Sequence, residues 1–135
     1  MEENARAKEE HALVMAFVAP SKRKRIAGFL RSAKNRTKFI AQLPHFSDFD
    51  PRFAKRIDSS RQDAASILHL LQSKGAGSTC YVLSVSGKID QTDGALERVL
   101  MDVVGYEPGT IVSCVPGRLA YYEGEDRGER YLLAR

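Results

Sequence analysis

The sequence predicts an α+β fold in which amino-terminal helices pack on a carboxyl-terminal, four-stranded mixed sheet with β-α-β-β-β order. Apolar residues recur at helical spacing in the first half of the chain, whereas short apolar runs typical of strands begin at Thr79. The length of 135 residues suits one domain, 1–135, with a helical half of about 1–75 and a sheet half of about 76–135. Both halves should share one core, because neither has enough apolar faces to satisfy itself.

Two long helices are expected first. Residues 3–18 form one helix, and Pro20 ends it because proline cannot donate the next helical hydrogen bond. Residues 13–18 are apolar all round, so a buried strand is the alternative there. Ser21 suits the N-cap of a second helix that continues to about Leu43.

A loop with two aromatic anchors follows over residues 44–51, and its Asp50-Pro51 pair is typical of a helix start. This predicts a short helix over about 51–57. A further helix is expected over 60–74, with Gly75 at its end. The glycine-rich segment that begins there ends a helix and enters a strand, which is the reverse of the order in a phosphate-binding loop.

In the second half of the chain, the spacing of apolar residues alternates between that of strands and that of a helix. Residues 79–85 are apolar on both alternations, as in a central strand whose two faces are covered. A helix from Thr92 or Asp93 to Val104 predicts a right-handed parallel crossover to the next strand, if the two strands are adjacent in the sheet. Three further strands, joined by short links and therefore antiparallel, are expected over 110–115, 118–123 and 130–134.

The composition is that of an ordinary globular chain, with 43% hydrophobic and 28% charged residues. The apolar stretch 12–19 is about half of a membrane-spanning length and follows acidic residues, so neither a signal peptide nor a membrane partner is expected. Cys80 and Cys114 stand alone in apolar segments. They predict buried thiols in the reducing cytoplasm, and a disulfide only if their strands are neighbours.

Basic residues are concentrated in the first 61 residues, which carry 14 Lys and Arg against 7 Asp and Glu; the remainder carries 7 against 10. No acidic residue occurs between Glu10 and Asp48. If residues 21–43 form one helix, four exposed cations follow one side of it in a nearly straight row. They are Lys24, Arg31, Lys34 and Lys38.

This row predicts a non-enzymatic binding or regulatory module that docks an anionic partner, either a nucleic acid or an acidic protein. Phosphates suit such a row, because counterion release rewards each neutralised charge without base contacts. A solvated basic helix face is the simpler alternative, since the row lacks aromatic side chains for base stacking apart from Phe39 at its margin.

The alternative function is a small enzyme with its site near the loop of His45, Asp48 and Asp50 and the strand end that carries Cys114. The loop could supply a metal site or an acid and a base, although both aspartates are also explained as turn and cap residues. Cys114 would need a base, and no His is near it in the sequence. A core thiol is the simpler interpretation.

Two further candidates lie at the end of the strand expected over 118–123. Tyr121 and Tyr122 point to opposite faces of a strand, so one of them should be packed and the other displayed. Glu123 begins an acidic turn, which is either a solvated hairpin loop or a docking surface. One His with two Asp is a weak ligand set, so we predict no metal site, and no cofactor is expected.

Overall fold

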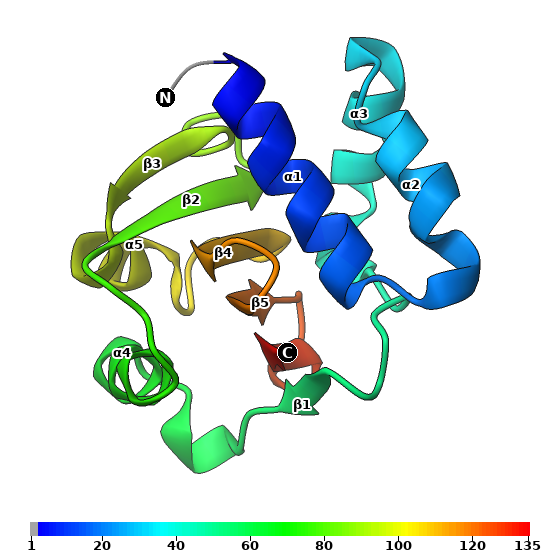
Figure 1. Cartoon of the computed structure of the whole chain (residues 1–135). Coiled ribbons are helices and arrows are strands. Elements are labelled where there is room, and N and C mark those ends of the chain that lie inside the picture. The colour runs from blue at the N-terminus through cyan, green and yellow to red at the C-terminus, as the bar shows by residue number, and fades with distance from the viewer. Residues whose placement is uncertain (1–2) are drawn as a thin grey trace.

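The computed structural model describes residues 3–135, and over this range the chain forms five helices and six strands (Figure 1). The helices are α1 (Glu3–Phe17), α2 (Arg23–Phe29), α3 (Ala33–Ala41), α4 (Ala64–Ser73) and α5 (Leu96–Val103). The strands are β1 (Ala54–Arg56), β2 (Thr79–Ser84), β3 (Thr92–Ala95), β4 (Thr110–Val115), β5 (Leu119–Glu123) and β6 (Arg130–Ala134).

The strands form one sheet with the order β1-β6-β5-β4-β2-β3, in which every neighbouring pair is antiparallel. The predicted four-stranded mixed sheet is therefore wrong, although the α+β class holds. The four expected strands correspond to β2, β4, β5 and β6. Two short strands, β1 and β3, were not expected.

The error in strand direction arises at residues 92–104, where the sequence predicted one helix. Thr92–Ala95 instead form β3, which pairs with β2, and the helix begins only at Leu96. Because β3 returns the chain to the end of the sheet where β2 began, α5 leads into a strand that is antiparallel to β2. A parallel crossover requires the helix to connect directly from the end of β2.

The other missed strand, β1, lies where a short helix was predicted over residues 51–57. Asp50 was expected to cap that helix. Its carboxylate instead accepts hydrogen bonds from the backbone N–H of Arg52 and from the guanidinium groups of Arg23 and Arg52. The chain then extends, and β1 pairs with β6 at one edge of the sheet, so the predicted helical half also contributes a strand.

The single helix predicted over residues 21–43 is interrupted. α2 ends at Phe29, and α3 begins after a turn whose last residue, Ser32, is the N-cap of α3. The Ser32 hydroxyl accepts a hydrogen bond from the N–H of Asn35. The chain changes direction at this turn (Figure 1), so α2 and α3 do not share one continuous face.

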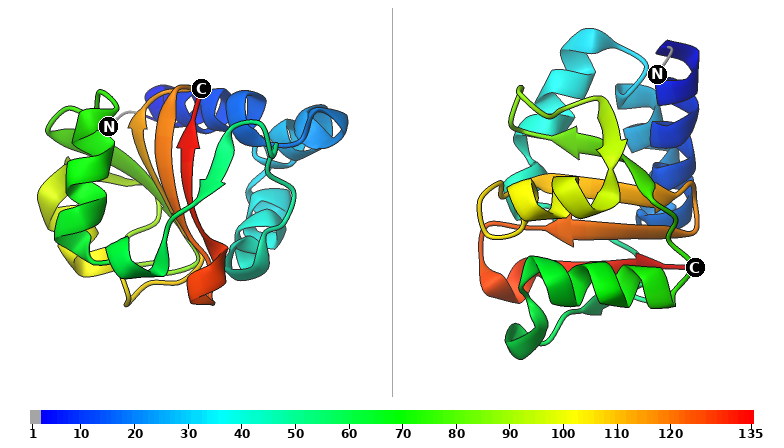
Figure 2. Two further views of the ribbon diagram at one scale, coloured as in Figure 1. Left: turned by 90° about the horizontal axis from the view of Figure 1, so that it is seen from below. Right: turned by 90° about the vertical axis from the view of Figure 1, so that its left-hand side faces the viewer.

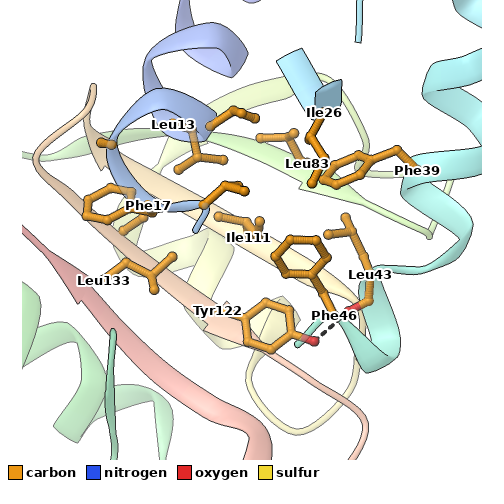
Figure 3. Close-up of a cluster of buried hydrophobic side chains, with 14 of the residues drawn as sticks. Leu13, Phe17, Ile26, Phe39, Leu43, Phe46, Leu83, Ile111, Tyr122 and Leu133 are labelled. Carbon is orange, nitrogen blue, oxygen red and sulfur yellow. Dashed lines mark hydrogen bonds between the residues drawn. The ribbon is translucent and has the colours of Figure 1, made fainter. Parts of the chain in front are cut away.

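Helices cover both faces of the sheet (Figure 2): α1, α2 and α3 lie on one face, and α4 and α5 on the other. Successive strand residues point to opposite faces, so each face has a core of its own. The first core, shown in Figure 3, joins Leu13, Phe17, Ile26, Phe39 and Leu43 to Leu83, Ile111, Tyr122 and Leu133. The second joins α4 and α5 to Cys80, Val112, Leu119, Tyr121 and Leu132.

Aromatic rings hold the loop after α3 against the first core. The rings of Phe46 and Phe49 are 4.8 Å apart, and those of Phe49 and Tyr122 are 4.9 Å apart, both with edge-to-face geometry. The Tyr122 hydroxyl donates a hydrogen bond to the Leu43 carbonyl (Figure 3). The expected two-aromatic anchor of this loop is thus confirmed.

Candidate anion-binding groove

A buried network of charges joins α1, α3 and the turn after β2. Arg36 donates hydrogen bonds to both carboxylate oxygens of Glu10, at 3.0 and 2.8 Å, and to both of Asp90, at 2.7 and 3.0 Å. Glu10 is only 3% exposed and also accepts a hydrogen bond from the hydroxyl of Tyr81. Because each charge is satisfied within the chain, we assign this network a structural role.

Asp50 forms a second buried ion pair, with Arg23 at 3.1 Å and Arg52 at 2.7 Å. The hydrogen bond from the Arg52 side chain lowers the pKa of Asp50 from its ordinary value of 3.8 to about 2. The carboxylate therefore stays ionised and braces the turn before β1. It is not available as a general acid or base near neutral pH.

His45 and Asp48 also pair with neighbours. His45 Nε2 lies 2.6 Å from Glu125 Oε2 in the turn after β5, at an exposed position. The Lys22 ammonium donates a 2.9 Å hydrogen bond to Asp48. The two side chains thus engage different partners, and the loop does not assemble His45, Asp48 and Asp50 into one site.

Cys114 lies on the α5-facing side of β4, beside Cys80 of the neighbouring strand β2. Both are free thiols, and burial raises the pKa of each to about 12, so neither resembles an activated nucleophile. The His45 loop meets the opposite end of β4, where Pro44 packs against Gly109. The structure therefore does not bring Cys114 and His45 together.

Tyr122 and Glu123 are both buried. Tyr122 belongs to the first core, and Tyr121, on the other face, is buried as well, so neither of the two is displayed. Glu123 accepts hydrogen bonds from the N–H of Gly105 and, at 2.8 Å, from the Tyr121 hydroxyl. Burial raises the pKa of Glu123 above its ordinary value of 4.5, and its contacts tie β5 to the end of α5.

The four cations expected in one row are all exposed but do not share one helix. Lys24 lies on α2, Arg31 lies in the turn, and Lys34 and Lys38 lie on α3. The row was derived from a continuous helix, and the interruption at Ser32 separates its members. Lys34 and Lys38 remain neighbours one helical turn apart.

A groove lies between β1 and α4, on the side of the sheet that α4 covers. Its volume is about 970 Å³, and Ile57 and Leu132 form part of its lining. One wall is the edge strand β1 and the other is a stripe of α4, and the segment that connects β1 to α4 also contributes to the lining. The stripe on α4 consists of Ala65, Ser66, His69, Leu70, Ser73 and Lys74.

The lining of this β1–α4 groove is strongly basic. Of the described residues that line it, four are cations and one is a carboxylate. The cations are Lys55, Arg56, Arg61 and Lys74. The carboxylate, Asp58, accepts hydrogen bonds from the backbone N–H and the hydroxyl of Ser60, which lower its pKa.

A second hollow, of about 480 Å³, continues from the groove past Lys74. It is lined by the start of β5 and the end of β6 and adds Arg118 and Arg135. Within residues 3–135, no carboxylate side chain lines this hollow. Arg61 and Lys74 lie at the two ends of α4, so the basic surface spans about 15 Å, and Arg118 continues it. The Arg135 guanidinium instead donates a hydrogen bond to the Ala16 carbonyl of α1.

The β1–α4 groove was not predicted from the sequence, because its cations are divided between the segment 55–61 and the end of α4. The sequence placed Lys55 and Arg56 in a helix, which would have directed their side chains to different positions. A usable signal was the small, polar stripe of Ser66, His69 and Ser73 at helical spacing opposite the buried face of α4.

Within residues 3–135, no group of three or more His, Cys, Asp or Glu side chains is arranged to hold a metal ion. No helix of the same range is both long enough and apolar enough to cross a lipid bilayer.

Comparison with protein-family models, with curated proteins and with solved structures finds no match for this chain. The β1–α4 groove is the candidate site that the geometry and charge of the described residues define.

Proposed function

We propose that the protein is a binding module that docks an anionic partner in the β1–α4 groove. The observation that carries this proposal is the charge of the groove, where the cations of Lys55, Arg61 and Lys74 outnumber one carboxylate that is already hydrogen-bonded to Ser60. Cations lining a concave surface concentrate anions more effectively than cations dispersed on a convex one. The groove is therefore a better candidate than the exposed cations of α2 and α3.

The absence of assembled acid–base or nucleophilic groups in the described residues of the groove favours binding over catalysis. His69 is the one imidazole in its lining, and the hydroxyls of Ser66 and Ser73 donate hydrogen bonds to Asp63 and to the Leu70 carbonyl. Neither serine contacts His69 through a hydrogen bond. The groove thus offers positive charge and shape without a nucleophile–base pair.

Two triple variants with the same loss of charge test the proposal. Lys55→Gln/Arg61→Gln/Lys74→Gln removes three cations from the groove, and Lys24→Gln/Arg31→Gln/Lys38→Gln removes three from α2 and α3. Fluorescence anisotropy measures the affinity of each for a labelled single-stranded oligonucleotide and for a labelled acidic peptide over a range of salt concentrations.

We expect the groove variant to lose affinity for at least one ligand and the α2–α3 variant to retain it. For the oligonucleotide, the loss of three phosphate contacts should reduce the slope of log K against log salt by about 2. If only the α2–α3 variant loses affinity, the partner docks where the sequence alone predicted. If the wild-type protein binds neither ligand at low salt, the proposal is wrong.

A further inference from the structure

The edge strand β1 has hydrogen-bonding groups that point away from the sheet. Ile57 N–H donates to the Arg130 carbonyl at 2.9 Å, and Ala134 N–H donates to the Phe53 carbonyl at 3.0 Å. In an antiparallel ladder the residues that bond to a given neighbour alternate, so Lys55 also bonds to β6, opposite Leu132. The peptide groups of Ala54 and Arg56 therefore point outward, and no strand within residues 3–135 pairs with them.

This edge borders the β1–α4 groove. Lys55 pairs with Leu132, whose side chain faces α4, so the Lys55 side chain shares the face of the sheet that α4 covers. A strand added beside β1 would place every second side chain on this face, at intervals of about 7 Å. Those side chains would enter the groove, where Lys55, Arg61 and Lys74 can bind negatively charged groups.

We infer that the anionic partner is an extended acidic peptide that adds as a strand to the outer edge of β1. This inference rests on the proposed function and specifies its ligand. The backbone of the peptide pairs with Ala54 and Arg56, and alternate carboxylates meet the groove cations. The groove wall formed by α4 is about 15 Å long, which matches four or five extended residues at about 3.3 Å each.

The lining of the groove favours a peptide over a nucleic acid. Apart from the imidazole of His69, its described residues include no aromatic ring on which bases could stack. The small side chains Ala65, Ser66 and Ser73 instead leave space along α4 for side chains of moderate size. An edge strand with free N–H and carbonyl groups can pair with a peptide backbone. A sugar–phosphate backbone cannot form the same ladder of hydrogen bonds.

Natural proteins also place Lys and Arg on edge strands to prevent pairing with other chains. Lys55 and Arg56 would have that effect against a neutral or basic strand. Against an acidic strand they are attractive, so the same two residues would select the partner by charge. A protective role alone predicts that acidic and neutral peptides both fail to bind.

Three ligands separate these possibilities: a labelled peptide of about six residues in which Glu alternates with Val, the same peptide N-methylated at alternate amides, and a single-stranded oligonucleotide. Fluorescence anisotropy at low salt gives the affinities for the full chain. N-methylation keeps every charge and removes strand pairing. We expect it to weaken binding about tenfold or more if it removes two hydrogen bonds.

Amide exchange provides a second measurement. The N–H groups of Ala54 and Arg56 should become protected when the unmodified peptide binds, and Ala54→Pro should weaken binding because it removes an outward donor without disturbing the bonds to β6. If the Ala54→Pro variant is unstable, the N-methylated peptide still tests strand pairing, because it is measured with the unmodified protein.

The possible results distinguish failure of the peptide inference from failure of the proposed function. If both peptides bind equally, or if Ala54 and Arg56 remain unprotected, strand addition is wrong and docking of anions in the groove stands. If the oligonucleotide alone binds through the groove cations, the peptide inference fails and the proposed function holds. If none of the three ligands binds, both proposals fail.

Discussion

On the α1–α3 face of the sheet, the charged side chains close to the core are paired within the chain, whereas on the α4 face the cations line an open groove. Arg36 forms ion pairs with Glu10 and Asp90. Asp50 forms ion pairs with Arg23 and Arg52. Within residues 3–135, Lys55, Arg56, Arg61 and Lys74 form no ion pair. The first arrangement stabilises the fold, and the second leaves charge available for a partner.

The difference follows from solvation. A buried charge loses its hydration and needs compensating hydrogen bonds, which Arg36 obtains from two carboxylates. A cation at the rim of a groove keeps most of its water and needs no partner in the chain. The position of a cation relative to the core, and not the local density of cations in the sequence, therefore separates structural residues from binding residues here.

The largest effect is expected for Arg36→Gln, which leaves Glu10 and Asp90 without their counterion. Breaking a buried ion pair in this way costs about 3–5 kcal/mol, so urea unfolding should show a loss of this size in the free energy of unfolding. Arg31→Gln, at an exposed position in the turn before α3, is the control and should change stability by less than about 0.5 kcal/mol. Similar small losses in both variants would show that the Arg36 network is not stabilising.

The two cores should differ in the stability that is lost when a leucine is replaced by alanine. Leu133, which is 0% exposed, packs against α1–α3, and its neighbour Leu132 faces α4 and lines the groove. Leu133→Ala should cost about 2–5 kcal/mol, because a closed cavity remains. Leu132→Ala should cost less, because its space opens into the groove and can fill with water. Equal losses in chemical denaturation would indicate that the groove floor is as tightly packed as the first core.

Most of the secondary structure could be predicted where one periodic pattern decides it. α1, the 79–85 strand and the strands from Thr110 onward have strong local signals and are found within a few residues of their expected bounds. β1 and β3 have only three and four residues and no alternation of their own. β1 pairs with β6, which is distant in the sequence, and β3 pairs with the preceding strand β2, so backbone pairing and not local propensity determines both strands.

The candidate site was less predictable than the fold class. Lys24, Arg31, Lys34 and Lys38 were identified as exposed cations, which they are, but their alignment depended on a helix that Ser32 interrupts. Arg36 lies in the same segment of the sequence. It is the paired, largely buried residue because two acids far apart in the chain, Glu10 and Asp90, meet it in the fold.

The paired charges should also control the pH dependence of stability. The pKa of Asp50 is about 2 in the folded state against 3.8 ordinarily, so its ion pairs stabilise the protein above pH 3.8. This contribution is lost as the pH falls toward 2. The difference in unfolding free energy between the wild type and Asp50→Asn should be full near neutral pH and shrink over that interval. A difference that stays constant down to pH 2 would show that Asp50 titrates normally.

Glu123, on the α4–α5 side, should cause a pH dependence of stability that is opposite in sign to that of Asp50 and smaller in size. Its nearest cation, Arg130, has its Nε 3.8 Å away, and burial raises the pKa of Glu123 above 4.5. A raised pKa contributes stability below 4.5 that is lost as the pH increases through the folded value. Glu123→Gln should therefore gain stability relative to the wild type as the pH rises, when measured by denaturation across the same series. A relative loss at high pH would mean that the ionised form is the favoured one.

The smallest effect on stability is expected when three cations are removed from the β1–α4 groove. Lys55→Gln/Arg61→Gln/Lys74→Gln changes three cations of the groove, two of them at exposed positions near β1 and one at the end of α4. Because none of the three has a carboxylate partner within residues 3–135, the free energy of unfolding should stay within about 0.5 kcal/mol of the wild type. A small gain is compatible with this account, since removing like charges relieves their repulsion. A loss above about 1 kcal/mol in urea denaturation would place these cations with Arg36 as structural residues. The reduced affinity of the variant would then no longer locate the binding site in the groove.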